Sequence, residues 1–313
     1  MIDIPVVLVL GAGASKPYGF PLGRGLVREA IDNSNDLEPI LAGIPITGDA
    51  LAMQLDEFLG NLYAANPTSI DAFMAAHSPR FDGIGRAVIA YHLMKNEDTV
   101  KLDDVSPADD WYQHFLHEML LSEGFDGFGF NKITVLTYNY DRSLEYAIFK
   151  MLHGLGNSEE ACRQALLRLN IRHLHGQIGY LPEICGEGRL YESRVDVARL
   201  QLAMRGIRLV PKSVEDDPVF QDAYEPLRSA KHVIFLGFGY LDQNVANLNL
   251  QENRMTNTSY WGTGVGVPPA VAKRLVRLFP KNGSGEGPTH ITIDTETGSV
   301  KDYLLNHPYL FSD

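Results

Sequence analysis

The chain has 313 residues, 45% hydrophobic and 21% charged, a balance typical of a globular protein that can bury a sizeable core. Its formal net charge of −12 argues against direct binding to nucleic acid, which requires a surplus of Lys and Arg facing phosphates. The two cysteines, Cys162 and Cys185, exclude a disulfide framework and a four-cysteine zinc site, and no residue spacing indicates a metal site.

The first expected element is a strand at Val6–Leu10, an apolar, β-branched run typical of a strand buried on both faces of a parallel sheet. It leads into a glycine loop instead of a signal-cleavage site, and a helix is expected over about 22–31. Since no stretch approaches the roughly 20 apolar residues that cross a bilayer, we expect a cytoplasmic protein without a membrane partner.

Residues 36–129 have a different character. Apolar residues recur there at helical spacing in 51–65, 84–94 and 111–121, with polar breaks between these segments. We therefore predict a helical module, residues 36–129, inserted into a single sheet domain that spans residues 1–313.

Strands and helices alternate in the rest of the chain. Strands are expected at 133–137, 171–174, 207–210, 232–236 and 291–293, and helices from Asp141 to about 152, over 218–230 and over 270–278. This alternation predicts an α/β fold with a Rossmann-type doubly wound, mostly parallel sheet.

Ligands of such a sheet bind beyond the carboxyl ends of its strands, and four candidate clusters fall at these ends. In the first, GAGAS at 11–15, small residues would let the backbone approach a pyrophosphate; the alternative is a tight turn without a ligand. A dehydrogenase would require G-x-G-x-x-G, whose last position is here Lys16, and an acidic residue at the end of a second strand. Hydride transfer is therefore disfavoured.

The second and third clusters supply polar side chains. In TYNYD at 137–141, the Asn139 amide could orient a ribose hydroxyl or a water, and Asp141 could hold the loop; alternatively they are a turn residue and a helix cap. In HLHG at 173–176, His175 could take a proton from a ribose hydroxyl or a water. The remaining histidines considered are interpreted as structural: His92, His114, His117 and His173.

The fourth cluster, GFGYLDQN at 237–244, again places glycines where a nucleotide could approach a buried strand. Asp242 or Asn244 could cap the following helix. The alternative is a plain turn between a strand and a helix.

Taken in this order, the four clusters resemble the sirtuin superfamily. The sirtuin NAD loop reads G-A-G-x-S-x-x-x-G-[I/F]-P-D-F-R, and residues 11–24 read GAGASKPYGFPLGR, which departs only at the Asp-Phe pair. The sirtuin T-Q-N-I-D appears as TYNYD, the catalytic histidine-glycine as His175-Gly176, and the late nucleotide loop as Gly237-Phe238-Gly239. The motifs span most of the chain.

Two sirtuin features that handle the peptide substrate do not occur here: the four-cysteine zinc module and the Phe-Gly-Glu strand. With the NAD-handling motifs retained, the chain resembles bacterial sirtuin-like NAD hydrolases of antiphage defence. The resemblance implies NAD glycohydrolase activity that releases nicotinamide and ADP-ribose, as an abortive-infection effector. Because a freely active NAD hydrolase would poison its own cell, we also expect latency, relieved by homo-oligomerisation or by a separate activator or sensor protein.

The resemblance also implies residue roles. Asn139 would position the ribose or the attacking water, and His175 would act as general base or as a partner that orients a hydroxyl. Asp141 would hold the loop and the nicotinamide side. The contacts to NAD would come from Gly11, Ala12, Gly13, Ser15, Gly19, Phe20, Pro21, Arg24, Thr137, Gly237, Phe238, Gly239 and Asp242. Two alternatives remain: an NAD-dependent protein deacylase, and a non-catalytic module that binds NAD or ADP-ribose and regulates a partner.

Overall fold

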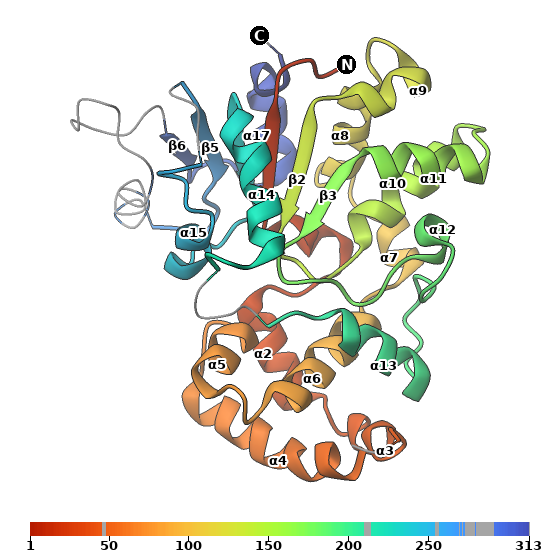
Figure 1. Ribbon diagram of the computed structural model, residues 1–313, viewed down its shortest axis with the longest axis vertical. Coiled ribbons are helices and arrows are strands. Elements are labelled where there is room, and N and C mark those ends of the chain that lie inside the picture. Colours follow the sequence, from red (N-terminus) through yellow and green to blue (C-terminus); the bar gives the residue numbers. More distant parts are fainter. Residues whose placement is uncertain are drawn as a thin grey trace.

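Six parallel strands form one sheet in the order β3-β2-β1-β4-β5-β6 (Figure 1). This computed structural model describes residues 1–45, 48–209, 214–253, 257–268, 270, 272, 279 and 291–312. The strands are β1 Val6–Leu10, β2 Ile133–Thr137, β3 Asn170–His173, β4 His232–Leu236, β5 Ser259–Thr263 and β6 Ile291–Asp294. The order reverses at β1, which lies between β2 and β4, so the predicted doubly wound fold is confirmed and its switch point lies at the ends of β1 and β4.

Most of the expected strands are found. Those at 6–10, 133–137 and 232–236 have the expected bounds, and those at 171–174 and 291–293 differ by one residue at one or both ends. The strand expected at 207–210 is wrong: helix α13, Val197–Gly206, precedes Ile207, which makes only an isolated antiparallel bridge with Gly176. Val210 lies outside the described residues, as does most of the helix expected over 270–278.

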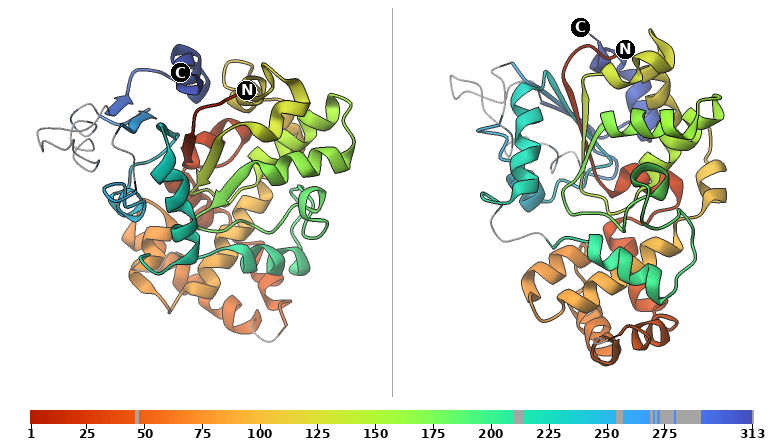
Figure 2. Two further views of the ribbon diagram at one scale, coloured as in Figure 1. Left: turned by 45° about the horizontal axis from the view of Figure 1, so that its top comes forward. Right: turned by 45° about the vertical axis from the view of Figure 1, so that its right-hand side comes forward.

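The pleat of the sheet separates two cores. Val6 and Leu8 pack into one core, and Val7 and Val9 pack into the other, because successive strand residues point to opposite faces. The first core includes side chains of α8 Trp111–Leu120, α10 Ser143–Gly154, α11 Glu159–Arg168 and α17 Val300–Asn306. The second includes those of α14 Pro218–Ser229 and α15 Asp242–Asn247. Helices therefore cover both faces of the sheet (Figure 2).

Another group of helices forms a helical lobe beyond the carboxyl ends of the strands (Figures 1 and 2). It consists of α2 Gly23–Asp32, α3 Leu37–Ala42, α4 Gly48–Ala65, α5 Ile70–His77, α6 Asp82–Lys95 and α13. The other described elements are the short helices α1 Ala12–Ser15, α7 Thr99–Asp103, α9 Gly124–Gly127 and α12 Pro182–Cys185 and the 3₁₀ turns Lys16–Tyr18, Phe128–Phe130 and Pro308–Phe311. Within the described ranges, no helix is long and apolar enough to cross a membrane.

A buried ion network joins the end of α6 to the start of α10. The carboxylate of Glu97 accepts two hydrogen bonds from the Arg142 guanidinium, each 2.8 Å long, and also pairs with Arg189. All three side chains are excluded from solvent. Arg142 Nη1 also donates to the carbonyl oxygens of Tyr180 at 2.8 Å and Arg189 at 2.7 Å. The network therefore ties the loop after β3 to the loop after β2.

His92 makes the free energy of unfolding depend on pH. Burial, with a smaller contribution from Lys95, lowers the pKa of His92 to about 4, and Ser34 Oγ lies 3.0 Å from its Nε2. The unfolded chain takes up a proton near pH 6.5, so the native state loses stability as the pH falls from about 6.5 towards 4. We expect the loss between pH 7.5 and pH 5 to be about 2 kcal/mol from this group.

Urea unfolding at both pH values, compared with His92→Gln, measures this contribution. The glutamine cannot be protonated, so the variant should lose less stability at pH 5 than the wild type. Equal losses in the two proteins would contradict the assignment.

Candidate functional site

Two glycine loops pack backbone to backbone at the switch point. Gly11 N donates to Leu236 O at 3.1 Å, and Gly13 N donates to Gly237 O at 2.9 Å. A Cβ at Gly13 would lie 2.8 Å from Gly237 Cα, and one at Gly237, whose φ is +56°, would lie 2.0 Å from Ala14 N. These glycines are therefore required by loop packing, and the N–H of Gly13 is already engaged by the protein.

A pocket of about 460 Å³ opens beside these loops, within the size range of small-molecule sites. It is lined by Ala12, Gly13, Lys16, Pro17, Leu22, Gly23, Asp109, Gly237, Phe238, Gly239, Thr263, Val265, Val267, Gly298, Ser299 and Val300. It lies at the carboxyl ends of β1, β4 and β5, where a doubly wound sheet binds its ligand.

Five of the expected contact residues line this pocket: Ala12, Gly13, Gly237, Phe238 and Gly239. The sequence interpretation missed its two charged side chains, Lys16 and Asp109. In the sequence, Lys16 was noted only because it replaces the last glycine of the dehydrogenase pattern. Asp109 lies in the distant loop before α8, and no local sequence pattern indicated a binding role for it.

The other expected contact residues lie elsewhere. Gly19 adopts φ +92° beneath the Lys101 side chain, Phe20 is buried, and Pro21 is half-buried. Arg24 is exposed in the first turn of α2, and Asp242 is exposed in the first turn of α15. None of them lines this pocket.

Asn139 connects the TYNYD segment, residues 137–141, to the GAGAS loop, residues 11–15. Its Nδ2 donates to Gly11 O at 2.9 Å and to the buried Ser15 Oγ at 3.0 Å, and its backbone N donates to Thr137 Oγ1 at 3.0 Å. Thr137 therefore holds the turn instead of facing a ligand. With Nδ2 committed to the glycine loop, the Oδ1 of Asn139 has no hydrogen-bond partner among the described residues. It can accept a hydrogen bond from a ligand hydroxyl or a water.

Asp141 is buried and serves the start of α10. Its Oδ1 accepts hydrogen bonds from the backbone N of Ser143, at 3.1 Å, and from the Ser143 hydroxyl, which also lies 2.7 Å from the Tyr112 hydroxyl. Burial raises the pKa of the Asp141 carboxyl, and the hydrogen bonds from Ser143 and Ser15 oppose that rise. The bonds to Ser143 place Asp141 at the start of α10, where the helix-cap alternative had put it.

His173 is a structural histidine. Its Nδ1 lies 2.9 Å from Asn139 O, and its Nε2 lies 2.6 Å from Glu145 Oε1. Burial would lower the pKa of His173, but the Glu145 carboxylate outweighs burial and the pKa is raised. Both nitrogens are engaged, and the side chain supports the turn that carries Asn139.

His175 has a different environment. It is 4% exposed, its Nε2 has no partner within the described structure, and its Nδ1 lies 4.0 Å from Asp71 Oδ1. Its ring packs edge-on against Tyr138, at 4.9 Å between centroids, and lies 5.9 Å from the Tyr140 ring. Burial lowers the pKa of His175, Asp71 opposes this, and Arg208 adds to it, so the imidazole is neutral at pH 7.

The structure does not bring His175 into the 460 Å³ pocket. Phe238 lines the pocket, Tyr138 packs on Phe238 at 5.3 Å between ring centroids, and His175 packs on Tyr138. Asn139 does not line the pocket either, but it bonds Gly11 and Ser15, which flank the lining residues Ala12 and Gly13 in the glycine loop. Two separate parts therefore meet at the switch point: the pocket with its glycine loops, and the buried cluster around His175.

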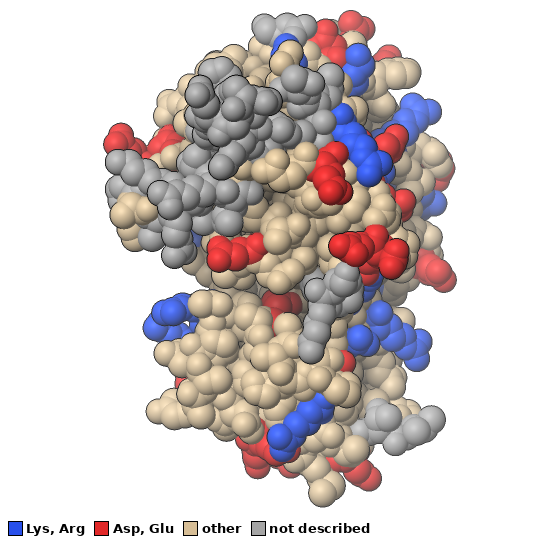
Figure 3. Space-filling model, turned by 60° about the vertical axis from the view of Figure 1, so that its left-hand side comes forward, with Lys and Arg blue, Asp and Glu red and all other residues tan. Residues whose placement is uncertain are grey.

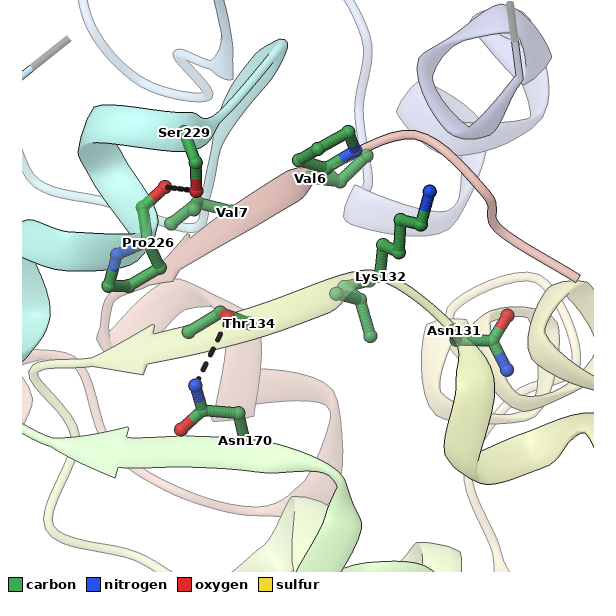
Figure 4. Close-up of a pocket in the computed structure, with 10 residues that line it drawn as sticks. Val6, Val7, Asn131, Lys132, Thr134, Asn170, Pro226 and Ser229 are labelled. Atoms are coloured by element: carbon green, nitrogen blue, oxygen red, sulfur yellow. Dashed lines mark hydrogen bonds between the residues drawn. The ribbon is translucent and has the colours of Figure 1, made fainter.

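A second hollow, of about 300 Å³, lies at the opposite edge of the sheet (Figure 4). It is formed at the amino ends of β1 and β2, beside Asn170 of β3 and the end of α14. Asn170 Nδ2 donates to Thr134 Oγ1 at 3.3 Å, and Ser229 Oγ donates to Pro226 O at 3.2 Å, so these polar groups already bond within the protein. This edge is opposite to the one at which doubly wound sheets bind ligands.

The charge on one face of the surface and the candidate metal-binding side chains give no sign of a second kind of site among the described residues. On the face drawn in Figure 3, the described Lys and Arg side chains are scattered among Asp and Glu instead of forming one basic surface. No group of three or more His, Cys, Asp or Glu side chains that could hold a metal ion occurs among the described residues.

The fold and this site define a doubly wound α/β protein with a pocket of about 460 Å³ at its switch point. No known protein-family model matches the chain, and no curated protein matches it significantly.

Proposed function

We propose that the protein is an NAD glycohydrolase that cleaves the bond between nicotinamide and ribose. The observation that supports this most is Asn139, whose Nδ2 is held by Gly11 O and Ser15 Oγ of the glycine loop that lines the pocket with Ala12 and Gly13, while its Oδ1 has no partner among the described residues. In this proposal the ADP part of NAD occupies the pocket, where Lys16 supplies a cation for the pyrophosphate and Asp109 an acceptor for ribose hydroxyls.

The chemistry requires orientation more than acid catalysis. A water oxygen forms a bond to the ribose C1′, the C–N bond breaks, and its electron pair leaves with neutral nicotinamide. Because positive charge develops on the ribose, oriented dipoles such as the Asn139 carbonyl stabilise the transition state. The proton lost by the water goes to a base, for which the unpartnered Nε2 of His175 is the candidate, and ADP-ribose is the second product.

The resemblance to sirtuin-like NAD hydrolases extends the proposal to a biological role. Because unrestrained hydrolysis would deplete the cell's own NAD, we propose an effector of abortive infection that stays latent until it assembles with further copies or meets an activator protein.

One observation favours a second candidate, a non-catalytic module that binds NAD or ADP-ribose. His175 does not line the pocket, and Tyr138 and Phe238 connect the two only through ring contacts. A binding module needs no base beside its ligand. NAD that binds and is never cleaved, with or without an activating extract, would support this candidate.

The test follows nicotinamide and ADP-ribose by chromatography after the purified protein meets NAD, alone and with extract from phage-infected cells. We expect the wild type to release both products and Asn139→Ala to release less than about one hundredth as much, because an orienting dipole is lost. Asn61→Ala, on the exposed face of α4, is the matched control and should keep full activity. Equal release by Asn139→Ala and the wild type would remove Asn139 from the site.

A further inference from the structure

His175 has one polar neighbour that comes from the helical lobe. Asp71 lies in the first turn of α5, and its Oδ1 is 4.0 Å from His175 Nδ1. This distance is too long for a hydrogen bond, so the carboxylate acts on the imidazole through space. The other ring nitrogen, Nε2, is buried without a partner among the described residues.

The Asp71 carboxylate is itself held in place. The hydroxyl of Tyr140 donates a short hydrogen bond to Asp71 Oδ1, the same oxygen that faces His175. Tyr140 belongs to the loop after β2, and its ring also packs beside the His175 ring. Three segments that are distant in the sequence therefore meet at one carboxylate oxygen.

The other charges around His175 do not replace Asp71. Arg208 donates its backbone N to His175 O at 2.8 Å, and its guanidinium pairs with Asp217 at 2.7 Å. Burial raises the pKa of the Tyr138 and Tyr140 hydroxyls well above 10, so both are neutral. Glu145 is engaged by His173. Asp71 is thus the acid that acts on the His175 ring, and Arg208 is the opposing cation.

We infer that Asp71 is a positioning residue that keeps the proton of neutral His175 on Nδ1, leaving the lone pair on Nε2. A carboxylate favours the proton on the nearer ring nitrogen, and the other nitrogen then becomes the acceptor. That Nε2 accepts the proton of the attacking water rests on the proposed NAD hydrolysis. The assignment of the tautomer does not depend on that proposal. A consequence is that the helical lobe contributes to the chemistry, because movement of α5 away from the sheet would withdraw Asp71.

The tautomer can be measured without any turnover. Long-range ¹⁵N–¹H correlation spectra of histidine-labelled protein distinguish the Nδ1–H from the Nε2–H form, and His175→Gln assigns the signals. We expect the Nδ1–H form in the wild type, and in Asp71→Asn a mixture of forms with a lower His175 pKa. Tyr140→Phe should shift the signals in the same direction by less. The Nε2–H form in the wild type, or an unchanged tautomer and pKa in Asp71→Asn, would overturn the inference.

Activity gives a second readout. Asp71→Asn should lower kcat for NAD by about 10- to 100-fold, part of what a general base contributes, with KM nearly unchanged. The acid limb of its pH profile should move to lower pH, because the charge that supports the imidazolium is gone. Asp49→Asn, in the first turn of α4, is the matched control. A fall in kcat without a change in tautomer or pH profile would show a merely structural role and overturn the inference. If no condition gives turnover, the NMR result still decides the role of Asp71, while the proposed hydrolysis fails separately.

Discussion

Replacing His175 by alanine is expected to lower NAD hydrolysis by about 10²- to 10⁴-fold, the usual contribution of a general base. The reason is the environment of Nε2, which is buried and has no partner among the described residues. Burial lowers the pKa of His175, and Asp71 opposes this effect and so keeps the imidazole more basic. Binding of NAD should change little, because in this proposal the pocket holds NAD by its ADP part, and His175 does not line the pocket. The expected result is therefore a loss of kcat with little change in the dissociation constant.

The measurement combines kcat over pH 5 to 9 with NAD binding by calorimetry. Burial lowers the pKa of His175, so the wild type should keep its rate below pH 6.5 and lose it only as the pH falls further and the imidazole becomes protonated. His175→Ala should lack this acid limb. His117→Ala, an exposed histidine of α8, is the control and should match the wild type. Full activity of His175→Ala would exclude His175 as the base. The proposed hydrolysis would then depend on the result for Asn139→Ala.

The second large effect concerns stability. Replacing Glu97 by glutamine should lower the free energy of unfolding by about 3 to 5 kcal/mol, because it leaves the buried guanidiniums of Arg142 and Arg189 without their counter-charge. Arg142 adjoins the loop that carries Asn139 and bonds the carbonyl oxygens of Tyr180 and Arg189. We therefore expect the variant to lose order at the site as well as global stability.

Urea unfolding followed by circular dichroism measures this effect. The matched control is Glu57→Gln, which removes the carboxylate of an exposed ion pair with Arg80 and should cost less than about 1 kcal/mol. Similar costs for the two substitutions would mean that the buried guanidiniums find other partners or water.

Local patterns were sufficient for most of the sheet. The runs at 6–10, 133–137 and 232–236 are apolar throughout or nearly so, because strands of a parallel sheet are buried on both faces, and their bounds are confirmed. β5 was not expected, since its sequence SYWGT mixes polar, aromatic and glycine residues, and it is recognised as a strand only by its pairing with β4 and β6. The apolar run after Gly206 was mistaken for a strand, although Ile207 is buried as a single residue against the loop at Gly176.

The same division holds for the site. The sequence by itself determined the strand-end clusters, and because parallel strands end at one edge, Asn139 does meet Gly11 and Ser15. Tertiary structure alone decided that Asp71 faces His175, that Asp109 lines the pocket, and that Glu97 neutralises Arg142 and Arg189. The physical reason is that these acids belong to the segment between β1 and β2. The spacing of apolar residues in this segment indicates only which face of each helix is buried. Their partners are set by how the helices pack over the end of the sheet, which no short pattern in the sequence contains.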